Sequence, residues 1–216
     1  MIINYNENLK TFHLKTKNTS YILKMLETGH ISHLYWGRKL KADNLEYFFR
    51  RRCFGSFCAD TDNISGFQLE LIPQECPTFG ATDLRYKSHR IYEGKQRLSG
   101  LPAVYAESEE EATSLEITLV DSLKNLEVIL TYNVFEDFDA ITRSLKIVNN
   151  SDEKINIERV LSANVDFTTD EFDFIQLSGS WGRERHILRN PLRSGSQAIE
   201  SRRGASSHAQ NPFMAL

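Results

Sequence analysis

The feature that most constrains this chain is an alternation of apolar and polar side chains with a period of two residues. It recurs in short runs separated by polar turns. The runs are 12–17, Tyr21–Leu26, Ile31–Trp36, Phe67–Leu71, Leu115–Leu119, Leu126–Tyr132, Thr142–Val148 and Ile155–Val160. Successive side chains of a β-strand point to opposite faces, so such a run buries one face and leaves the other in water. Many short strands of this kind predict an all-β protein, a large antiparallel β-sandwich. At most short helical turns are expected, around Asp43–Phe49.

The connections between these runs have the composition of turns. Asp121–Asn125 and Asn149–Lys154 are polar clusters at the positions where hairpin connections are expected. No linker rich in Pro, Ser or Gly divides the 216 residues, and this length is enough to bury a sizeable core. We therefore expect residues 1–216 to form one domain.

Composition excludes several classes of protein. The hydrophobic fraction of 40% and the charged fraction of 25% are ordinary for a globular protein, unlike a disordered or collagen-like chain. No uncharged apolar run approaches the roughly 20 residues that span a bilayer. The net charge of −3 favours neither nucleic acid nor an anionic membrane. Met1–Glu7 lacks the features of a secretory signal, and the three cysteines are an odd number, so we expect a reducing, cytoplasmic location.

Two clusters allow a ligand-binding interpretation beside an ordinary one. Cys53 and Cys58, with Cys76 and a distant histidine, have the residue types for a zinc site, although free cysteines are more often small buried hydrophobes. The three arginines Arg50–Arg52 follow two phenylalanines, a combination that can bind phosphate or bases. In a net acidic chain such arginines more often pair with carboxylates.

The familiar catalytic motifs are missing from the sequence. There is no Gly-rich phosphate loop, no nucleophile elbow and no HExxH motif. His30 and His33 are three residues apart, but a turn and a strand would not bring them together on one ligand. No pair of carboxylates stands out as an acid and base. The residues therefore predict no catalytic side chain, no metal site and no cofactor.

Trp181 is the one candidate for a binding residue. It lies between Ser180 and Gly182 in the stretch Ser178–Arg185, which has no strand period. Small neighbours cannot shield the indole, so it could offer a surface on which a sugar ring stacks. The alternative is a core anchor, because tryptophan is highly buried on average.

Six stretches carry a resemblance to a known family. They are Gly29–Gly37 (GHISHLYWG), Leu71–Gly80 (LIPQECPTFG), Asp83–Gly94 (DLRYKSHRIYEG), Leu98–Tyr105 (LSGLPAVY), Trp181–Arg185 (WGRER) and Glu200–Leu216 (ESRRGASSHAQNPFMAL). With them, nearly the whole chain resembles the N-terminal domain of bacterial α-galactosidases (melibiases) of glycoside hydrolase family thirty-six.

The resemblance implies a fold and a role. The domain of this family is a β-supersandwich that precedes a (β/α)8 barrel, and the barrel carries a nucleophile and an acid/base of a retaining mechanism on α-galactosides such as melibiose and raffinose-type sugars. A barrel needs at least about 200 residues, so the resemblance implies that both catalytic aspartates lie outside these 216 residues. It also implies that Trp181 reaches the galactose pocket, that this domain packs on the barrel, and that homo-oligomers form.

Two departures from the family are visible. In tetrameric members a loop of this domain lends a carboxylate to a pocket, but the matching stretch Arg51–Phe57 contains no Asp or Glu. Gly80 also runs almost directly into Asp83, where relatives carry a further strand pair, on the order of 20 residues. A stand-alone galactoside-binding module and a purely structural sandwich therefore remain alternatives to part of an α-galactosidase.

Overall fold

A computed structural model describes residues 2–41, 44–45, 47, 72–78, 89–91, 99–100, 104–107, 112–121, 123–167, 169–201 and 209–216. These residues form antiparallel strands and no α-helix, which confirms the all-β prediction. No helix among them is long and apolar enough to cross a membrane. The expected strand Phe67–Leu71 and most of the expected helical turn Asp43–Phe49 lie outside the described residues.

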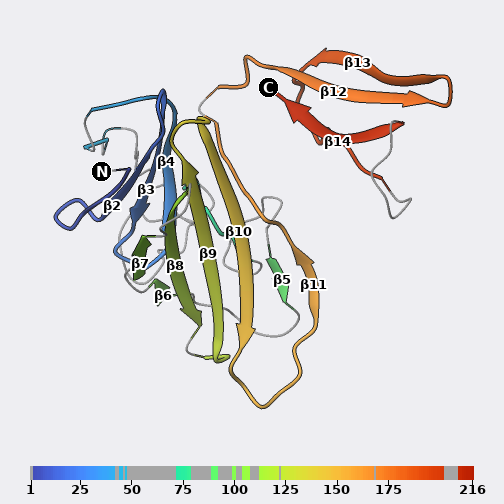
Figure 1. The fold of residues 1–216 in the computed structure, drawn as a ribbon. Coiled ribbons are helices and arrows are strands. Elements are labelled where there is room, and N and C mark those ends of the chain that lie inside the picture. Colours follow the sequence, from blue (N-terminus) through green and yellow to red (C-terminus); the bar gives the residue numbers. More distant parts are fainter. Residues whose placement is uncertain are drawn as a thin grey trace, which may run out of the picture. The chain divides into compact units, whose positions relative to one another are not determined.

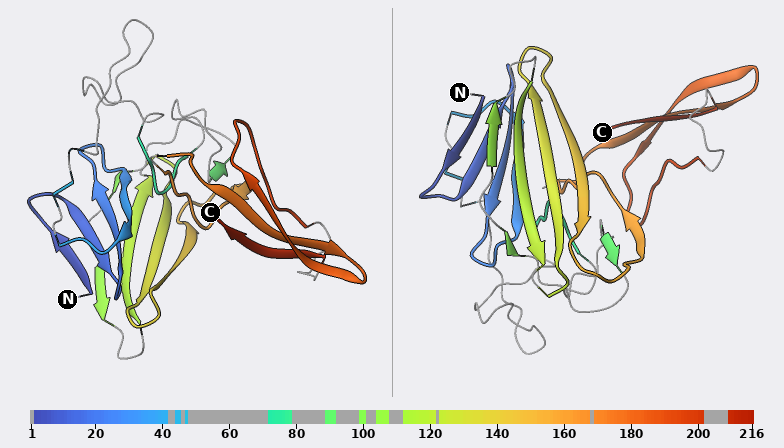
Figure 2. Two further views of the ribbon diagram at one scale, coloured as in Figure 1. Left: turned by 90° about the horizontal axis from the view of Figure 1, so that it is seen from above. Right: turned by 60° about the horizontal axis from the view of Figure 1, so that its bottom comes forward.

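The chain divides into two compact units, Met1–Asp166 and Phe167–Leu216. The first unit contains two facing sheets and a small strand pair. The second contains one three-stranded sheet (Figures 1 and 2). Each is described by itself below.

The first sheet has the order β1-β2-β3-β4. Its strands are β1 (Ile3–Asn6), β2 (Thr11–Lys15), β3 (Thr19–Met25) and β4 (Ile31–Arg38). Alternation predicts one wet face, but β2, the middle of β3 and the first half of β4 are buried on both faces. On the second face Ile22 and Leu34 pack with Leu40 and Leu45, because the chain after β4 folds back over this sheet. The expectation of a wet face is therefore wrong for these strands.

The second sheet follows the predicted pattern closely. Its main strands are β8 (Thr113–Asp121), β9 (Leu126–Phe135) and β10 (Ala140–Asn149), and the shorter β6 (Ser99–Gly100) and β7 (Val104–Glu107) pair with β8. Along β9, buried and half-buried residues alternate at every position. The predicted turn Asp121–Asn125 joins β8 to β9, with the Asp121 carboxylate accepting the amide N–H of Leu123 at 2.9 Å.

The other predicted turn has a different role. Asn149–Lys154 leads from β10 to β11 (Ile157–Val160), and β11 pairs with β5 (His89–Ile91) rather than with β10. Within the described part of the chain it thus connects two separate sheets, so the hairpin interpretation of this turn is wrong.

The two large sheets enclose the core of the first unit (Figure 1). Apolar side chains meet from both sheets, and burying such surface is the dominant stabilising term in folding. The buried members of this cluster are Ile3, Phe12, Leu14, Tyr21, Leu23, Ile31, Cys76, Leu115, Ile117, Leu119, Val128, Leu130, Tyr132 and Val134. The predicted β-sandwich is confirmed for this unit. Cys76 is buried in this core, whereas Cys53 and Cys58 lie outside the described residues.

A polar clamp joins two turns, one from each large sheet. The Asp139 carboxylate, in the turn before β10, accepts hydrogen bonds from the Thr16 hydroxyl at 2.7 Å and the Asn18 amide N–H at 2.7 Å. Both donors lie in the turn between β2 and β3. Their hydrogen bonds lower the pKa of Asp139, because they favour the charged carboxylate.

The second unit is a single sheet of order β13-β12-β14. Its strands are β12 (Asp173–Ser180), β13 (Arg183–Pro191) and β14 (Gln210–Ala215). Phe174 is the one large apolar side chain that is buried among the described residues of this unit. Ile187, Leu188, Phe213 and Met214 are exposed on its strands. The described part of this unit therefore has almost no core of its own.

Candidate functional site

The candidate binding residue Trp181 lies at the tip of the hairpin formed by β12 and β13 (Figure 1). Ser180 pairs with Arg183, so Trp181 and Gly182 are the two residues of the turn. Gly182 has φ of 76°, a left-handed conformation that costs glycine little and other residues more. The sequence Trp-Gly thus suits a tight two-residue turn that pushes the indole away from the strands.

A bulge fixes the strands just below the turn. The register shifts between Ser178 and Ser180, and Arg185 on the facing strand has φ of 55°. A Cβ on Gly179 would lie only 2.0 Å from the carbonyl oxygen of Arg183, so this close approach of the two backbones requires glycine. The amide N–H of Gly182 donates to Glu184 Oε1 at 2.7 Å. The backbone geometry therefore explains why glycine occupies both positions, Gly179 and Gly182.

The indole of Trp181 is 96% exposed. The core-anchor interpretation is therefore wrong. The flat face of the ring is available to stack on a ligand, and the indole N–H can donate a hydrogen bond. The residues that follow, Arg183–Arg185, are also exposed and offer charged hydrogen-bonding groups beside the ring. That the ring contacts a sugar remains a prediction.

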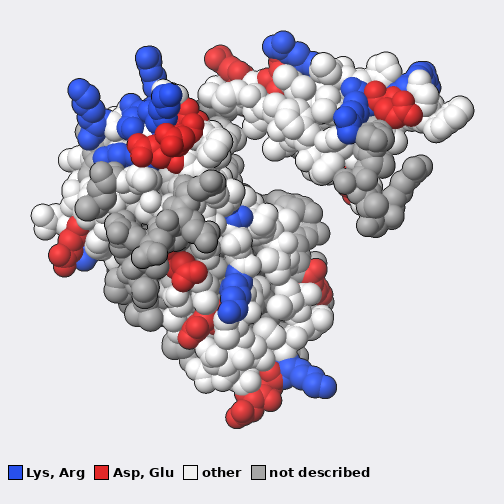
Figure 3. Space-filling model, viewed as in Figure 1, with Lys and Arg blue, Asp and Glu red and all other residues white. Residues whose placement is uncertain are grey.

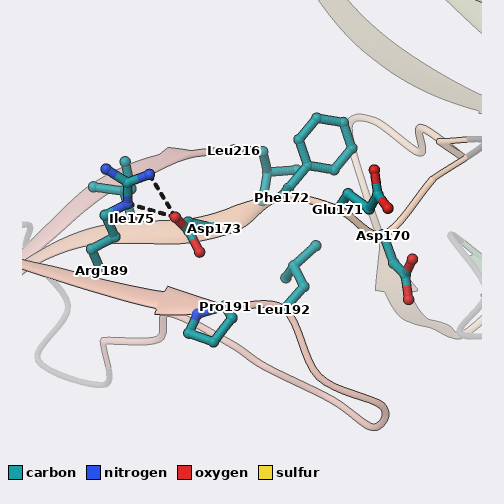
Figure 4. Close-up of a pocket in the computed structure, with 9 residues that line it drawn as sticks. All are labelled: Asp170, Glu171, Phe172, Asp173, Ile175, Arg189, Pro191, Leu192 and Leu216. Carbon is teal, nitrogen blue, oxygen red and sulfur yellow. Dashed lines mark hydrogen bonds and ion pairs between the residues drawn. The ribbon is translucent and has the colours of Figure 1, made fainter.

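A hollow of about 530 Å³ lies at the other end of the same sheet (Figure 4). It combines carboxylates, an arginine and apolar side chains. Its lining residues are Asp170, Glu171, Phe172, Asp173, Ile175, Arg189, Pro191, Leu192 and Leu216. The eight residues of β12 separate it from Trp181 by more than about 20 Å at the usual rise of a strand. One sugar ring cannot contact both places.

The charged groups of this hollow are partly engaged with each other. The guanidinium of Arg189 donates from Nε and Nη2 to Asp173 Oδ2, both at 2.6 Å (Figure 4). The Arg189 side chain is largely exposed, and exposed ion pairs contribute little to stability. The pair therefore orients Asp173 along the sheet more than it stabilises the unit.

A buried carboxylate that the sequence analysis did not single out lies inside the first unit. Glu75 is fully buried, and its Oε1 and Oε2 accept the hydroxyls of Tyr21 and Tyr132, each at 2.7 Å. Nδ1 of His33 lies 3.0 Å from Oε1, and Nε of Arg143 lies 3.5 Å from Oε2. In the sequence, Leu71–Gly80 carries only a family resemblance, and no spacing rule connects a glutamate there with side chains from four strands.

The pKa values around Glu75 show that it is held as an anion. Burial alone would raise the pKa of Glu75, but the hydrogen bond from His33 and the charge of Arg143 outweigh burial, and the pKa is lowered. Burial raises the pKa of the Tyr21 and Tyr132 hydroxyls, and the neighbouring Glu75 charge raises it further. Both tyrosines therefore remain hydrogen-bond donors to the carboxylate.

The remaining candidates are not brought together by the structure. The arginines Arg50–Arg52 and the loop Arg51–Phe57 lie outside the described residues, as do Gly80–Asp83 and most of the stretch from Ser201 to His208. Among the residues that are described, no group of three or more His, Cys, Asp or Glu could hold a metal ion. On the face shown in Figure 3, the acidic and basic side chains of the described residues are interspersed and form no extensive field of one sign.

The fold and the hairpin fit a domain of a known class, the N-terminal domains of glycosyl hydrolases. The model of the glycosyl hydrolase family 36 N-terminal domain matches residues 80–216. The chain belongs to this family.

The curated relatives are α-galactosidases. The α-galactosidase AgaA of Geobacillus stearothermophilus is 44% identical over 236 residues, which cover 100% of this chain and 32% of the relative. The bifunctional α-galactosidase/sucrose kinase AgaSK of Mediterraneibacter gnavus is 38% identical over 100% of this chain and 25% of its own length. The chain thus spans about a third or less of these relatives.

Solved structures give the same result. The α-galactosidase from Lactobacillus brevis superposes with a TM-score of 0.90 at 30% identity, over 98% of this chain and 31% of that one. A variant of AgaA from Geobacillus stearothermophilus, in complex with raffinose, superposes with a TM-score of 0.81 at 42% identity, over 95% of this chain and 31% of that one. The resemblance to this family is confirmed over the whole chain.

Proposed function

We propose that this chain is the N-terminal part of an α-galactosidase that hydrolyses terminal α-galactosides such as melibiose and raffinose-type sugars. The match of the entire chain to α-galactosidases carries this proposal. The chemistry belongs to two carboxylates of a catalytic barrel, one a nucleophile and one an acid/base, which act with retention through a covalent glycosyl-enzyme.

In this proposal the chain supports the barrel and does not cleave the sugar itself. It packs on the barrel and presents the exposed indole of Trp181 to the galactose pocket. A hairpin whose backbone requires glycine at Gly179 and favours it at Gly182 holds the ring away from the sheet, which supports a contact beyond this domain. We further propose that the enzyme acts in the cytoplasm and forms homo-oligomers.

Hydrolysis of an aryl α-galactoside tests whether the catalytic carboxylates belong to the barrel and not to this chain. The purified 216-residue chain is expected to give no turnover, whereas the enzyme in which it is joined to a family barrel is expected to be active. Turnover by the isolated chain that survives repeated purification would overturn the proposal that the catalytic carboxylates lie elsewhere.

A second candidate function is a stand-alone galactoside-binding module. The observation in its favour is the free indole face of Trp181, which needs no barrel to be accessible. Calorimetric titration of the isolated chain with galactose or melibiose separates the two. Heat that saturates at millimolar sugar and disappears in Trp181→Ala supports the module, and no heat supports the enzyme part.

A further inference from the structure

Segment 72–78 lies along β4 and is fixed there by its backbone. The amide N–H of His33 donates to the Pro73 carbonyl at 2.9 Å, and the amide N–H of Glu75 donates to the Ile31 carbonyl at 2.9 Å. The hydroxyl of Ser32 also donates to the Pro73 carbonyl, at 2.8 Å. These bonds tie the segment to the first sheet alone.

The Glu75 side chain connects the segment to both sheets. Two of its neighbours, Tyr21 and His33, belong to β3 and β4 of the first sheet. The other two, Tyr132 and Arg143, belong to β9 and β10 of the second. Nη2 of Arg143 also donates to the backbone carbonyl of Glu75 at 2.5 Å. A single carboxylate thus receives hydrogen bonds or charge from four strands on two facing sheets.

The geometry points to a charge-dependent latch. We propose that the Glu75 carboxylate is the internal counter-ion that holds segment 72–78 between the two sheets, and that protonation of this side chain releases the segment. The inference is independent of the proposed enzymatic function.

The groups that face Glu75 act as hydrogen-bond donors to it. Tyr21 and Tyr132 donate through hydroxyls, and Arg143 donates through N–H groups that have no acceptor role. A protonated carboxyl carries its own hydrogen, which the N–H groups of Arg143 cannot accept. A tyrosine hydroxyl can accept it only by turning away its own hydrogen, so that its present donation to Glu75 is lost. Arg143, whose side chain is 9% exposed, then keeps a buried charge without its anion, which is strongly destabilising.

The direction of the pH effect follows from the lowered pKa of Glu75. In the unfolded chain the side chain takes up a proton near its ordinary value of 4.5, but in the folded chain it does so only at lower pH. Its contribution to stability is therefore complete above the unfolded value and is lost as pH falls through the folded value. In that window one linked proton changes the unfolding constant by up to about tenfold per pH unit.

Hydrogen exchange on the 216-residue chain tests the latch. In Glu75→Gln the peptide covering 72–78 is expected to lose protection at neutral pH, while peptides from β8 and β9 keep theirs. The dependence of the unfolding constant on pH below 4.5 is expected to weaken in the same variant. Unchanged protection of 72–78 together with an unchanged pH dependence would overturn the proposal. Glu116→Gln makes the same chemical change at an exposed position of β8 and serves as the matched control.

A milder variant keeps the test decisive if Glu75→Gln does not fold. Tyr132→Phe removes one hydroxyl donor and leaves the carboxylate in place. The carboxyl carbon resonance of Glu75, followed by NMR against pH, is expected to titrate at a higher pH in Tyr132→Phe than in the unmodified chain. Equal midpoints in the two proteins would contradict the latch.

Discussion

Trp181 is exposed because of its two glycine neighbours in space, Gly179 and Gly182. Gly182 supplies the left-handed residue of the turn, and Gly179 allows the two strands to approach closely at the bulge. The sequence predicted a candidate stacking surface from the small residues beside the tryptophan. It could not predict the 2.0 Å approach, because that distance depends on the register of β12 against β13.

Removal of the indole is expected to weaken substrate binding by the assembled enzyme. Loss of one stacking contact costs about 1 kcal/mol, which raises KM about fivefold in Trp181→Ala. Trp181→Phe should retain most of the effect because a flat ring remains. Phe138→Ala removes an aromatic ring that is 72% exposed in the turn between β9 and β10, and is the control. A KM for Trp181→Ala equal to that of the control would show that the ring does not contact the sugar.

The two hairpin glycines are expected to differ in their tolerance of a methyl group. At Gly182 nothing lies within 4 Å of an added Cβ, so Gly182→Ala should cost only the left-handed backbone, about 1 kcal/mol. At Gly179 the Cβ would collide with backbone, so Gly179→Ala should rearrange the turn. Amide NMR shifts of residues 178–186 measure both: small changes are expected for the first and large changes throughout the range for the second. Near-identical spectra for Gly179→Ala and the unmodified chain would be the contrary result.

At the scale of strands and turns, the period-two pattern succeeded where one face of a sheet is less buried than the other. Leu126–Tyr132 lies within β9, whose alternation of burial is complete. The pattern failed for the first sheet, because its polar positions are paired inside the protein. His13 and Ser20 are both buried, and Nε2 of His13 lies 2.8 Å from the Ser20 hydroxyl. A polar residue in alternation predicts a wet face only if no internal partner satisfies it.

The turn clamp on Asp139 predicts a pH-dependent contribution to stability. Asp139→Asn is expected to lower the melting temperature at neutral pH, because the neutral amide accepts the Thr16 and Asn18 hydrogen bonds less well. The pKa of Asp139 is lowered from its ordinary 3.8, so this advantage is present above 3.8 and is lost as pH falls through the lower folded value. The melting temperatures of the two proteins should therefore converge in acid. Asp137→Asn, in the same turn, is the control, and a constant difference down to strong acid would contradict the clamp.

At the scale of the whole molecule, the two units differ in the core that each contains. The first unit has nearly all the buried apolar side chains of the described chain, whereas the second has Phe174. Composition and length could not predict this division, because a run of apolar residues does not show whether a facing sheet covers it. Their exposure follows from the absence of a facing sheet within that unit's described residues.

Separate expression of the two units is expected to give unequal results. Residues 1–166 should fold with a cooperative thermal transition, because both large sheets and their shared core are present. Residues 167–216 should lack such a transition, because a small sheet needs a buried apolar face to be stable. Circular dichroism during heating measures both. A cooperative transition for 167–216 alone would show that this sheet is stabilised by something other than a core.

The exposed tip of the hairpin has an optical consequence. The chain contains two tryptophans, Trp36 and Trp181, and the second is 96% exposed. An indole surrounded by water fluoresces at long wavelength, and its emission shifts to shorter wavelength when a surface displaces that water. With Trp36 replaced by phenylalanine, Trp181 would be the sole source of tryptophan fluorescence. A shift of the Trp181 emission to shorter wavelength would then show that a barrel surface, a sugar or a second copy of the chain has covered the hairpin tip.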